Sequence, residues 1–148
     1  MQDDYTYVVL ADDDEDDRLF FTEAFDELKI KTKVDTYKDG VALMEALNHP
    51  DSSLPNILFL DLNMPKKSGF ECLVDLKKNK KFKNIAIAIY STSASEEDIE
   101  NTFVNGANIY IKKPHDFNHL KRVLSEVVTT NWQYLTNGMN KENFLLRL

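Results

Sequence analysis

The chain is poor in several residue types and patterns, and each shortage argues against a class of protein. A single cysteine, Cys72, can form neither an internal disulfide nor a cysteine metal cluster, so we expect a reducing, cytoplasmic setting. The first residues are acidic where a signal peptide is basic, and no apolar run approaches the ~20 residues of a membrane span. With 18 Lys and Arg against 25 Asp and Glu, the composition also does not favour nucleic-acid binding.

The negative charge is concentrated in one place. The formal net charge is -7, and the six consecutive acids at residues 12–17 account for nearly all of it. Anions stabilise the N-terminus of a helix, which is our interpretation for residues 14–17. Asp12 and Asp13 directly follow an apolar segment and are therefore candidates for chemistry.

Predicted strands and helices alternate along the chain, which has 148 residues and a hydrophobic content of 43%. Apolar, β-branched and aromatic runs predict strands over residues 5–11, 33–37, 56–62, 85–90 and 108–111. Helical spacing of apolar residues predicts helices over residues 18–28, 41–47, 69–78, 95–105 and 117–128. This alternation predicts an α/β fold with a parallel, doubly wound sheet.

The C-terminal segment follows a different pattern. Residues 129–148 include Trp132, Tyr134 and Phe144, which is too much apolar material for an inert tail and too little for a second core. We expect a domain over residues 1–129 and an extension over residues 130–148. The extension would pack on the domain or on a partner, including a second copy in a homodimer.

Polar side chains follow four of the five predicted strands. They are Asp12 and Asp13, Asp61, Ser91 and Thr92, and Lys112 and Lys113. Because ligands bind at the carboxyl ends of the strands in an open parallel sheet, we expect these side chains to face one small pocket. Strand alternation lets only one residue of the hydroxyl pair and one of the lysine pair point inward.

Three carboxylates in one pocket would repel one another, and a hard divalent cation would remove that conflict. Mg²⁺ suits the site because it prefers oxygen ligands and keeps several waters, which leaves room for a phosphate oxygen. A lysine on the other side supplies the second positive charge that phosphoryl transfer requires. Asp61, on the central strand, is the best candidate for a carboxylate nucleophile.

Four motifs occur in order within this alternation: LADDDEDD, LDLNMPKKSGFE, YSTSA and YIKKP. Together they make residues 5–129 resemble a response-regulator receiver domain of two-component signalling. The resemblance implies a flavodoxin-like (βα)5 fold with strand order 2-1-3-4-5. It also implies a single-domain response regulator that catalyses its own phosphorylation and dephosphorylation and is not otherwise an enzyme.

The resemblance implies a role for each acidic position. Asp61 would accept the phosphoryl group from a sensor histidine kinase or a histidine phosphotransfer protein. Asp13 would bind Mg²⁺ directly, and Asp12 would act mainly through water. The backbone carbonyl of Asn63 would be a further metal ligand.

The resemblance also selects among the remaining candidates. Family spacing makes Ser91 the switch hydroxyl and Lys113 the active-site lysine, with Thr92 and Lys112 facing elsewhere. Tyr110 matches the switch aromatic residue of the last strand. The bond between Lys113 and Pro114 is usually cis in the family.

Two other functions stay open on the sequence. A phosphatase of the haloacid-dehalogenase type also uses an aspartyl nucleophile, but it wants a second acid two residues later, where this chain has Asn63. A receiver-like interaction module that takes no phosphate is the other alternative. We expect neither nucleic acid nor membrane as a partner, and the sequence does not identify the downstream protein target.

Overall fold

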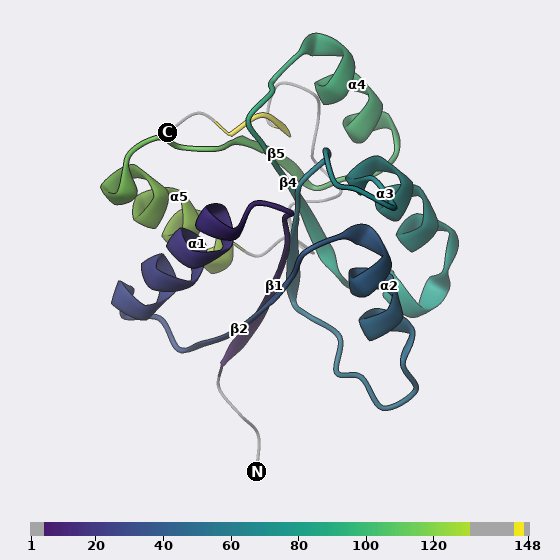
Figure 1. The fold of residues 1–148 in the computed structure, drawn as a ribbon, viewed down its shortest axis with the longest axis horizontal. Coiled ribbons are helices and arrows are strands. Elements are labelled where there is room, and N and C mark those ends of the chain that lie inside the picture. Colours follow the sequence, from purple (N-terminus) through teal and green to yellow (C-terminus); the bar gives the residue numbers. More distant parts are fainter. Residues whose placement is uncertain (1–4, 131–143, 147–148) are drawn as a thin grey trace.

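A computed structural model of the chain describes residues 5–130 and 144–146 and has three layers, with helices on both faces of a sheet (Figure 1). The strands are β1 (Thr6–Ala11), β2 (Thr32–Tyr37), β3 (Ile57–Leu60), β4 (Ala86–Ser91) and β5 (Ile109–Lys112). All pairings are parallel, in the order β2-β1-β3-β4-β5. The predicted fold class and strand order are therefore confirmed.

The helices are α1 (Glu15–Glu27), α2 (Gly40–Asn48), α3 (Gly69–Lys78), α4 (Glu96–Val104) and α5 (Phe117–Thr129). Figure 1 shows α1 and α5 on one face of the sheet and α2, α3 and α4 on the other. A short 3₁₀ helix, η1 (Lys80–Phe82), was not predicted and precedes β4. Within the described residues, no helix is both long and apolar enough to span a membrane.

Strand alternation divides the core into two layers. The layer under α1 and α5 contains Phe21, Phe59 and Tyr90, whose rings pack edge to face at centroid distances of 5.1–6.2 Å. The opposite layer contains fully buried Leu58 and Leu60 of β3 against α2 and α3. Since β3 is buried on both faces, its end is held rigidly, and Asp61 follows it directly.

Side-chain caps place the helix starts near the strand ends. Asp14 accepts a hydrogen bond from the Asp17 amide, which begins α1 at Glu15, three residues before the predicted start. The apolar periodicity starts later than the helix because its first turn is acidic. Ser68 and Glu71 form a reciprocal capping box at the start of α3, whose predicted bounds are confirmed.

Gly69 allows α3 to begin directly against the backbone of Asp61. A Cβ at this position would lie 2.0 Å from the Asp61 carbonyl oxygen, far inside contact distance. The Gly69 amide also donates a hydrogen bond to the Leu62 carbonyl at 3.0 Å. The glycine is therefore a packing requirement of the loop that follows Asp61.

We expect Gly69→Ala to lower the free energy of unfolding by about 1–3 kcal/mol, because the loop after Asp61 must shift to admit the methyl group. Urea denaturation measures the change. Glu45→Ala, at an exposed position of α2, is the control and should stay within about 0.5 kcal/mol of the wild type. A Gly69→Ala protein as stable as the wild type would contradict the close approach.

Candidate functional site

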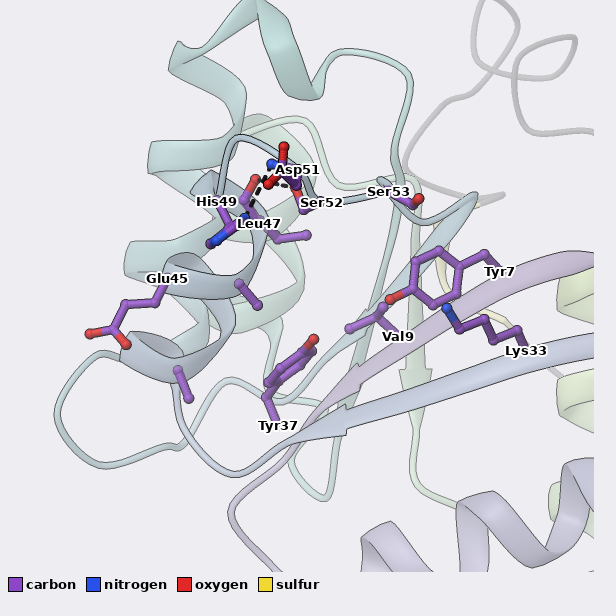
Figure 2. Close-up of a pocket in the computed structure, with 12 residues that line it drawn as sticks. Tyr7, Val9, Lys33, Tyr37, Glu45, Leu47, His49, Asp51, Ser52 and Ser53 are labelled. Carbon is purple, nitrogen blue, oxygen red and sulfur yellow. Dashed lines mark hydrogen bonds between the residues drawn. The ribbon is translucent and has the colours of Figure 1, made fainter.

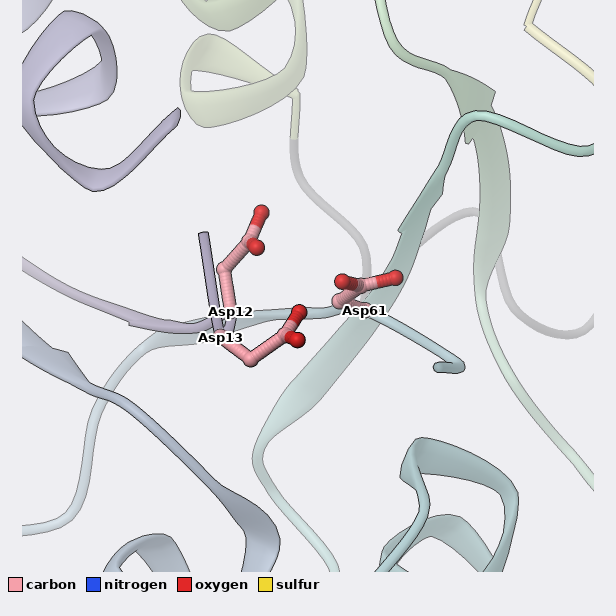
Figure 3. A group of neighbouring side chains, drawn as sticks. All are labelled: Asp12, Asp13 and Asp61. Carbon is pink, nitrogen blue, oxygen red and sulfur yellow. The ribbon is translucent and has the colours of Figure 1, made fainter. Parts of the chain in front are cut away.

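Three carboxylates meet at the carboxyl ends of β1 and β3 (Figure 3). One oxygen from each of Asp12, Asp13 and Asp61 lies within 4.8 Å of the others. Asp12 is 0% exposed and Asp61 is 5% exposed, whereas Asp13 faces solvent. The predicted acidic cluster is thus formed, with one side open to water.

Backbone hydrogen bonds fix the two buried acids. The Asp61 amide donates to the Ala11 carbonyl at 3.0 Å, and the Asp12 amide donates to the Tyr37 carbonyl at 3.0 Å. The side chains are oriented in turn, since Asp61 Oδ1 accepts from the Asn63 amide at 3.3 Å. Their positions therefore follow from the sheet register rather than from loop packing alone.

Lys113 is the cation of the site. Its Nζ lies 2.8 Å from Asp12 Oδ2, 2.8 Å from Asp17 Oδ2 and 3.5 Å from Asp61 Oδ2. The lysine is buried, and its amide donates to the Ser91 carbonyl at 2.8 Å, which fixes the residue beyond the end of β5. One ammonium group therefore faces the acids that follow β1 and β3 and an acid of the first turn of α1.

The crowding changes the acid–base properties of the buried groups. Burial raises the pKa of Asp61 to about 7, helped by Asp12 and opposed by Lys113. Burial also raises the pKa of Asp12, against the opposing effect of Lys113. For Lys113, burial favours the neutral amine, but contacts with Asp12 and Asp17 outweigh it and raise the pKa. The lysine therefore stays charged while the carboxylates compete for protons.

The donor set fits a hard divalent cation. The buried Oδ2 of Asp12 accepts no well-aligned hydrogen bond from the described residues, although Lys113 is close. Its neighbours Asp13 and Asp61 offer only oxygen ligands, which Mg²⁺ and Mn²⁺ prefer. A cation here would offset the negative charge that the three carboxylates share, including the part of the pKa rise of Asp61 that comes from Asp12.

In each of the two pairs of neighbouring polar residues at the strand ends, one side chain is buried and the other is exposed, as strand alternation requires. Ser91 and Lys113 are buried, while Thr92 and Lys112 are exposed. Ser91 Oγ accepts a hydrogen bond from the Ser93 amide at 3.2 Å, inside the loop between β4 and α4. The inward positions are those that the family spacing selected.

Tyr110 lies in the core beside this loop. It is 0% exposed, and its hydroxyl donates a hydrogen bond to the Ser93 carbonyl at 2.6 Å. Tyr110 is thus connected to the segment that begins at Ser91. This contact joins β5 to the site without touching the carboxylates.

Two residues of the site were missed by sequence reasoning. Asp17 was interpreted only as a helix N-terminal charge, but its carboxylate also pairs with Lys113. The signal was its place in the first turn of a helix that begins three residues after Asp12, beside the ends of the strands. Tyr90 places its ring 5.4 Å from Lys113 Nζ, as in a cation–π contact, and only its place before Ser91 hinted at this.

The peptide bond between Lys113 and Pro114 differs from the family expectation. The described residues contain no cis peptide bond, so this bond is trans. The trans form is the ordinary state of a residue–proline bond, favoured by about 0.5–1 kcal/mol.

A separate pocket has a lining that includes none of the three carboxylates (Figure 2). It has a volume of about 700 Å³ and is lined by residues of β1, β2, α2 and the loop after α2. Several polar groups in it already bond to protein atoms, since Tyr7 donates to Asp35 and Asp51 donates its amide to His49. We assign no chemistry to this pocket.

Comparisons with known proteins agree with this geometry. Residues 8–125 match the family model of the response regulator receiver domain. The chain is 29% identical over 123 residues to a probable methanogenesis regulatory protein, FilR2, of Methanothrix harundinacea, covering 81% of this chain and 79% of that protein. It is 28% identical over 124 residues to the response regulator Rcp1 of Synechocystis, covering 81% of this chain and 84% of Rcp1.

Solved structures show the same relationship. The Mn²⁺-bound form of Rcp1 superposes with a TM-score of 0.78 at 28% identity, covering 85% of this chain and 96% of that one. The phosphorylated cyanobacterial phytochrome response regulator RcpA gives a TM-score of 0.77 at 29% identity, covering 83% and 91%. The fold and the acidic site define a flavodoxin-like signalling domain. The chain belongs to the response regulator receiver domain family.

The raised pKa of Asp61 makes stability depend on pH in metal-free buffer. Because the folded value of about 7 exceeds the ordinary 3.8, the wild type loses stability as pH rises from about 4 to about 7. Asp61→Asn removes this loss, so we expect it to be more stable than the wild type by up to about 4 kcal/mol at pH 8, with the difference shrinking toward pH 4. Urea denaturation across this range, with EDTA present, measures it.

Asp26→Asn, at an exposed position of α1, is the control and should follow the wild-type profile. A constant difference between wild type and Asp61→Asn at every pH would show that the carboxylate is not strained by its surroundings.

Proposed function

We propose that the protein is a phosphorylation-dependent response regulator, in which Asp61 accepts a phosphoryl group from a histidine kinase or a histidine phosphotransfer protein. One observation carries the proposal: Asp61 lies beside a carboxylate pair suited to a divalent cation and 3.5 Å from the ammonium group of Lys113. Membership of the receiver family supports it, because receiver domains are phosphoacceptor switches that partner with histidine kinases. The phosphorylated RcpA structure, a relative at 29% identity, supports it further.

In the proposed reaction, a carboxylate oxygen of Asp61 attacks the phosphorus of a phosphohistidine. A new P–O bond forms, and the P–N bond breaks with its electron pair staying on the imidazole nitrogen of the donor. Mg²⁺, held by Asp13, Asp61 and the Asn63 carbonyl with Asp12 acting through water, would offset negative charge on the transferred group.

Lys113 has the second task in this reaction. Its Nζ is 3.5 Å from Asp61 Oδ2, so it can pair with an oxygen of a phosphoryl group on Asp61. Asp12 and Asp17 hold the ammonium group in that place. Lys113 therefore already lies close to where the phosphoryl group would be, and the site is preorganised for the transfer.

The readout would run through Ser91 and Tyr110. A phosphoryl oxygen on Asp61 offers the Ser91 hydroxyl a new acceptor, and this differential contact shifts a two-state equilibrium of the loop after β4. Tyr110 bonds to Ser93 in that loop, so its position responds. The output would be an altered protein-binding face formed by α4, β5 and α5.

The division of the chain belongs to the same proposal. Residues 1–129 would form the receiver, and residues 130–148 would extend it as a segment for contacts with the domain or with a partner. Trp132 and Tyr134 of this extension lie outside the described residues.

Incubation with acetyl phosphate and Mg²⁺ should add one phosphoryl group to the native protein, measured as a mass increase. Asp61→Asn should show none, because the nucleophilic carboxylate is gone, whereas Asp26→Asn should be labelled like the wild type. Equal labelling of Asp61→Asn, or no labelling of native protein, would overturn the proposal and favour an interaction module that takes no phosphate.

Mg²⁺ alone should stabilise the native protein at pH 8, by about 1.4 kcal/mol at roughly ten times its dissociation constant. Asp12→Asn and Asp61→Asn should each reduce this gain, because each removes a carboxylate of the predicted site. Thermal denaturation with and without MgCl₂ measures it. The same gain in all three proteins would place the bound ion elsewhere.

A further inference from the structure

The C-terminal residues 144–146 lie against the free edge of β5, beside the face that α4 borders (Figure 1). Leu145 forms an isolated parallel bridge with Tyr110, and the Leu146 amide donates a hydrogen bond to the Tyr110 carbonyl at 2.9 Å. These contacts give β5 a partner on its outer side.

Phe144 is the anchor of this segment. It is 0% exposed, and its ring centroid lies 5.4 Å from that of Phe103 in α4 and 6.1 Å from that of Tyr110. A fully buried aromatic ring is typical of the anchor residues of protein interfaces. The rings of Phe103 and Tyr110 form a socket between α4 and β5, and Phe144 fills it.

The segment also reaches both core layers. Phe144 and Leu145 pack with the layer on the side of α2, α3 and α4, whereas Leu146 packs with the layer of α1 and α5. The contact therefore wraps around the edge of the sheet. An edge strand offers unpaired backbone groups to any chain that lies beside it, and this segment uses part of them.

We propose that the edge of β5, with the socket of Phe103 and Tyr110, is a peptide-binding site that residues 144–146 occupy from within the same chain. A partner segment with an aromatic residue followed by two aliphatic residues would bind by displacing them. Addition of a peptide to an exposed sheet edge, with a side-chain pocket for specificity, is an established mode of recognition. Because residues 144–146 belong to the same chain, their effective concentration at the site is high. A partner segment must bind tightly enough to compete with that concentration.

A link between this site and Asp61 rests on the proposed function. Tyr110 contacts the segment with its ring and its carbonyl, and its hydroxyl bonds to Ser93 in the loop that begins at Ser91. Under the proposed function, a shift of that loop on phosphorylation moves Tyr110 and so changes the affinity of the socket for residue 144. By linkage, displacement of the segment changes the phosphorylation equilibrium by the same factor.

The test uses a fluorescein-labelled peptide of residues 140–148 and the full-length protein. Phe144→Ala empties the socket, so we expect this variant to bind the peptide about tenfold or more tightly than the wild type, whose own segment competes. The same peptide with alanine at the Phe144 position should not bind. Fluorescence anisotropy measures the affinities, and circular dichroism verifies that the variant is folded.

Leu146→Asp is a second variant that should release the segment from the site, because it weakens the contact with the edge of β5 without leaving a buried cavity. It should also bind the peptide more tightly than the wild type does. Equal binding by wild type and both variants, or no binding by a folded variant, would overturn the proposal. A wild-type dimer that dissociates on Phe144→Ala would overturn it too, because the occupant would then come from a second copy.

Beryllofluoride with Mg²⁺ separates this proposal from the proposed function. Under the link through Tyr110, it should change the peptide affinity of the wild type and leave that of Asp61→Asn unchanged. If acetyl phosphate fails to label Asp61 while the variants still bind the peptide, the proposed function fails and the peptide site stands. If Asp61 is labelled and both folded variants ignore the peptide, the peptide site fails alone.

Discussion

The balance of charge around Lys113 is the constraint on which the site depends. One buried ammonium group faces Asp12, Asp17 and Asp61, which lie after β1, in α1 and after β3. A buried carboxylate is costly unless it is paired, and one lysine cannot fully pair three acids. The excess negative charge adds to burial in raising the pKa of Asp61, and it makes the site suited to a divalent cation.

The sheet makes this unfavourable cluster possible. Asp12 and Asp61 continue strands that are buried on both faces, and backbone hydrogen bonds hold each beyond its strand end. The core therefore offsets the cost of crowding the acids, since neither can retreat without breaking ladder contacts. Gly69 completes the arrangement, because a helix can begin against the Asp61 carbonyl only where no side chain intervenes.

A chain of contacts leads from the acidic cluster to the outer edge of the sheet. Ser91 bonds to the Ser93 amide, the Ser93 carbonyl accepts from Tyr110, and the Tyr110 ring packs on Phe144. Spatial continuity alone does not prove coupling, which needs an element with two arrangements that both ends bias. Under the proposed function, the loop after β4 is that element, with Phe144 as a competitor for one of its faces.

Local sequence patterns foretold most of the fold. The apolar run before Asp61 predicts a strand buried on both faces because such a strand needs no polar face, and the capping pair Ser68 and Glu71 marks a helix start in the residues themselves. Strand alternation together with family spacing also placed Ser91 inside and Thr92 outside. The exceptions are at element ends, as with η1, where a few local hydrogen bonds decide the outcome.

The sequence by itself therefore determined the layers, the strand order through the resemblance, and the set of acids, hydroxyl and lysine at the strand ends. Only the tertiary structure decided that Asp17 pairs with Lys113, 96 residues away, that Tyr90 lies beside the ammonium group and that Phe144 fills the socket at β5. The physical reason is the separation along the chain of the residues that interact. Periodicity and capping act between neighbours in the chain, whereas charge pairing and ring packing depend on which distant segments the folded sheet brings together.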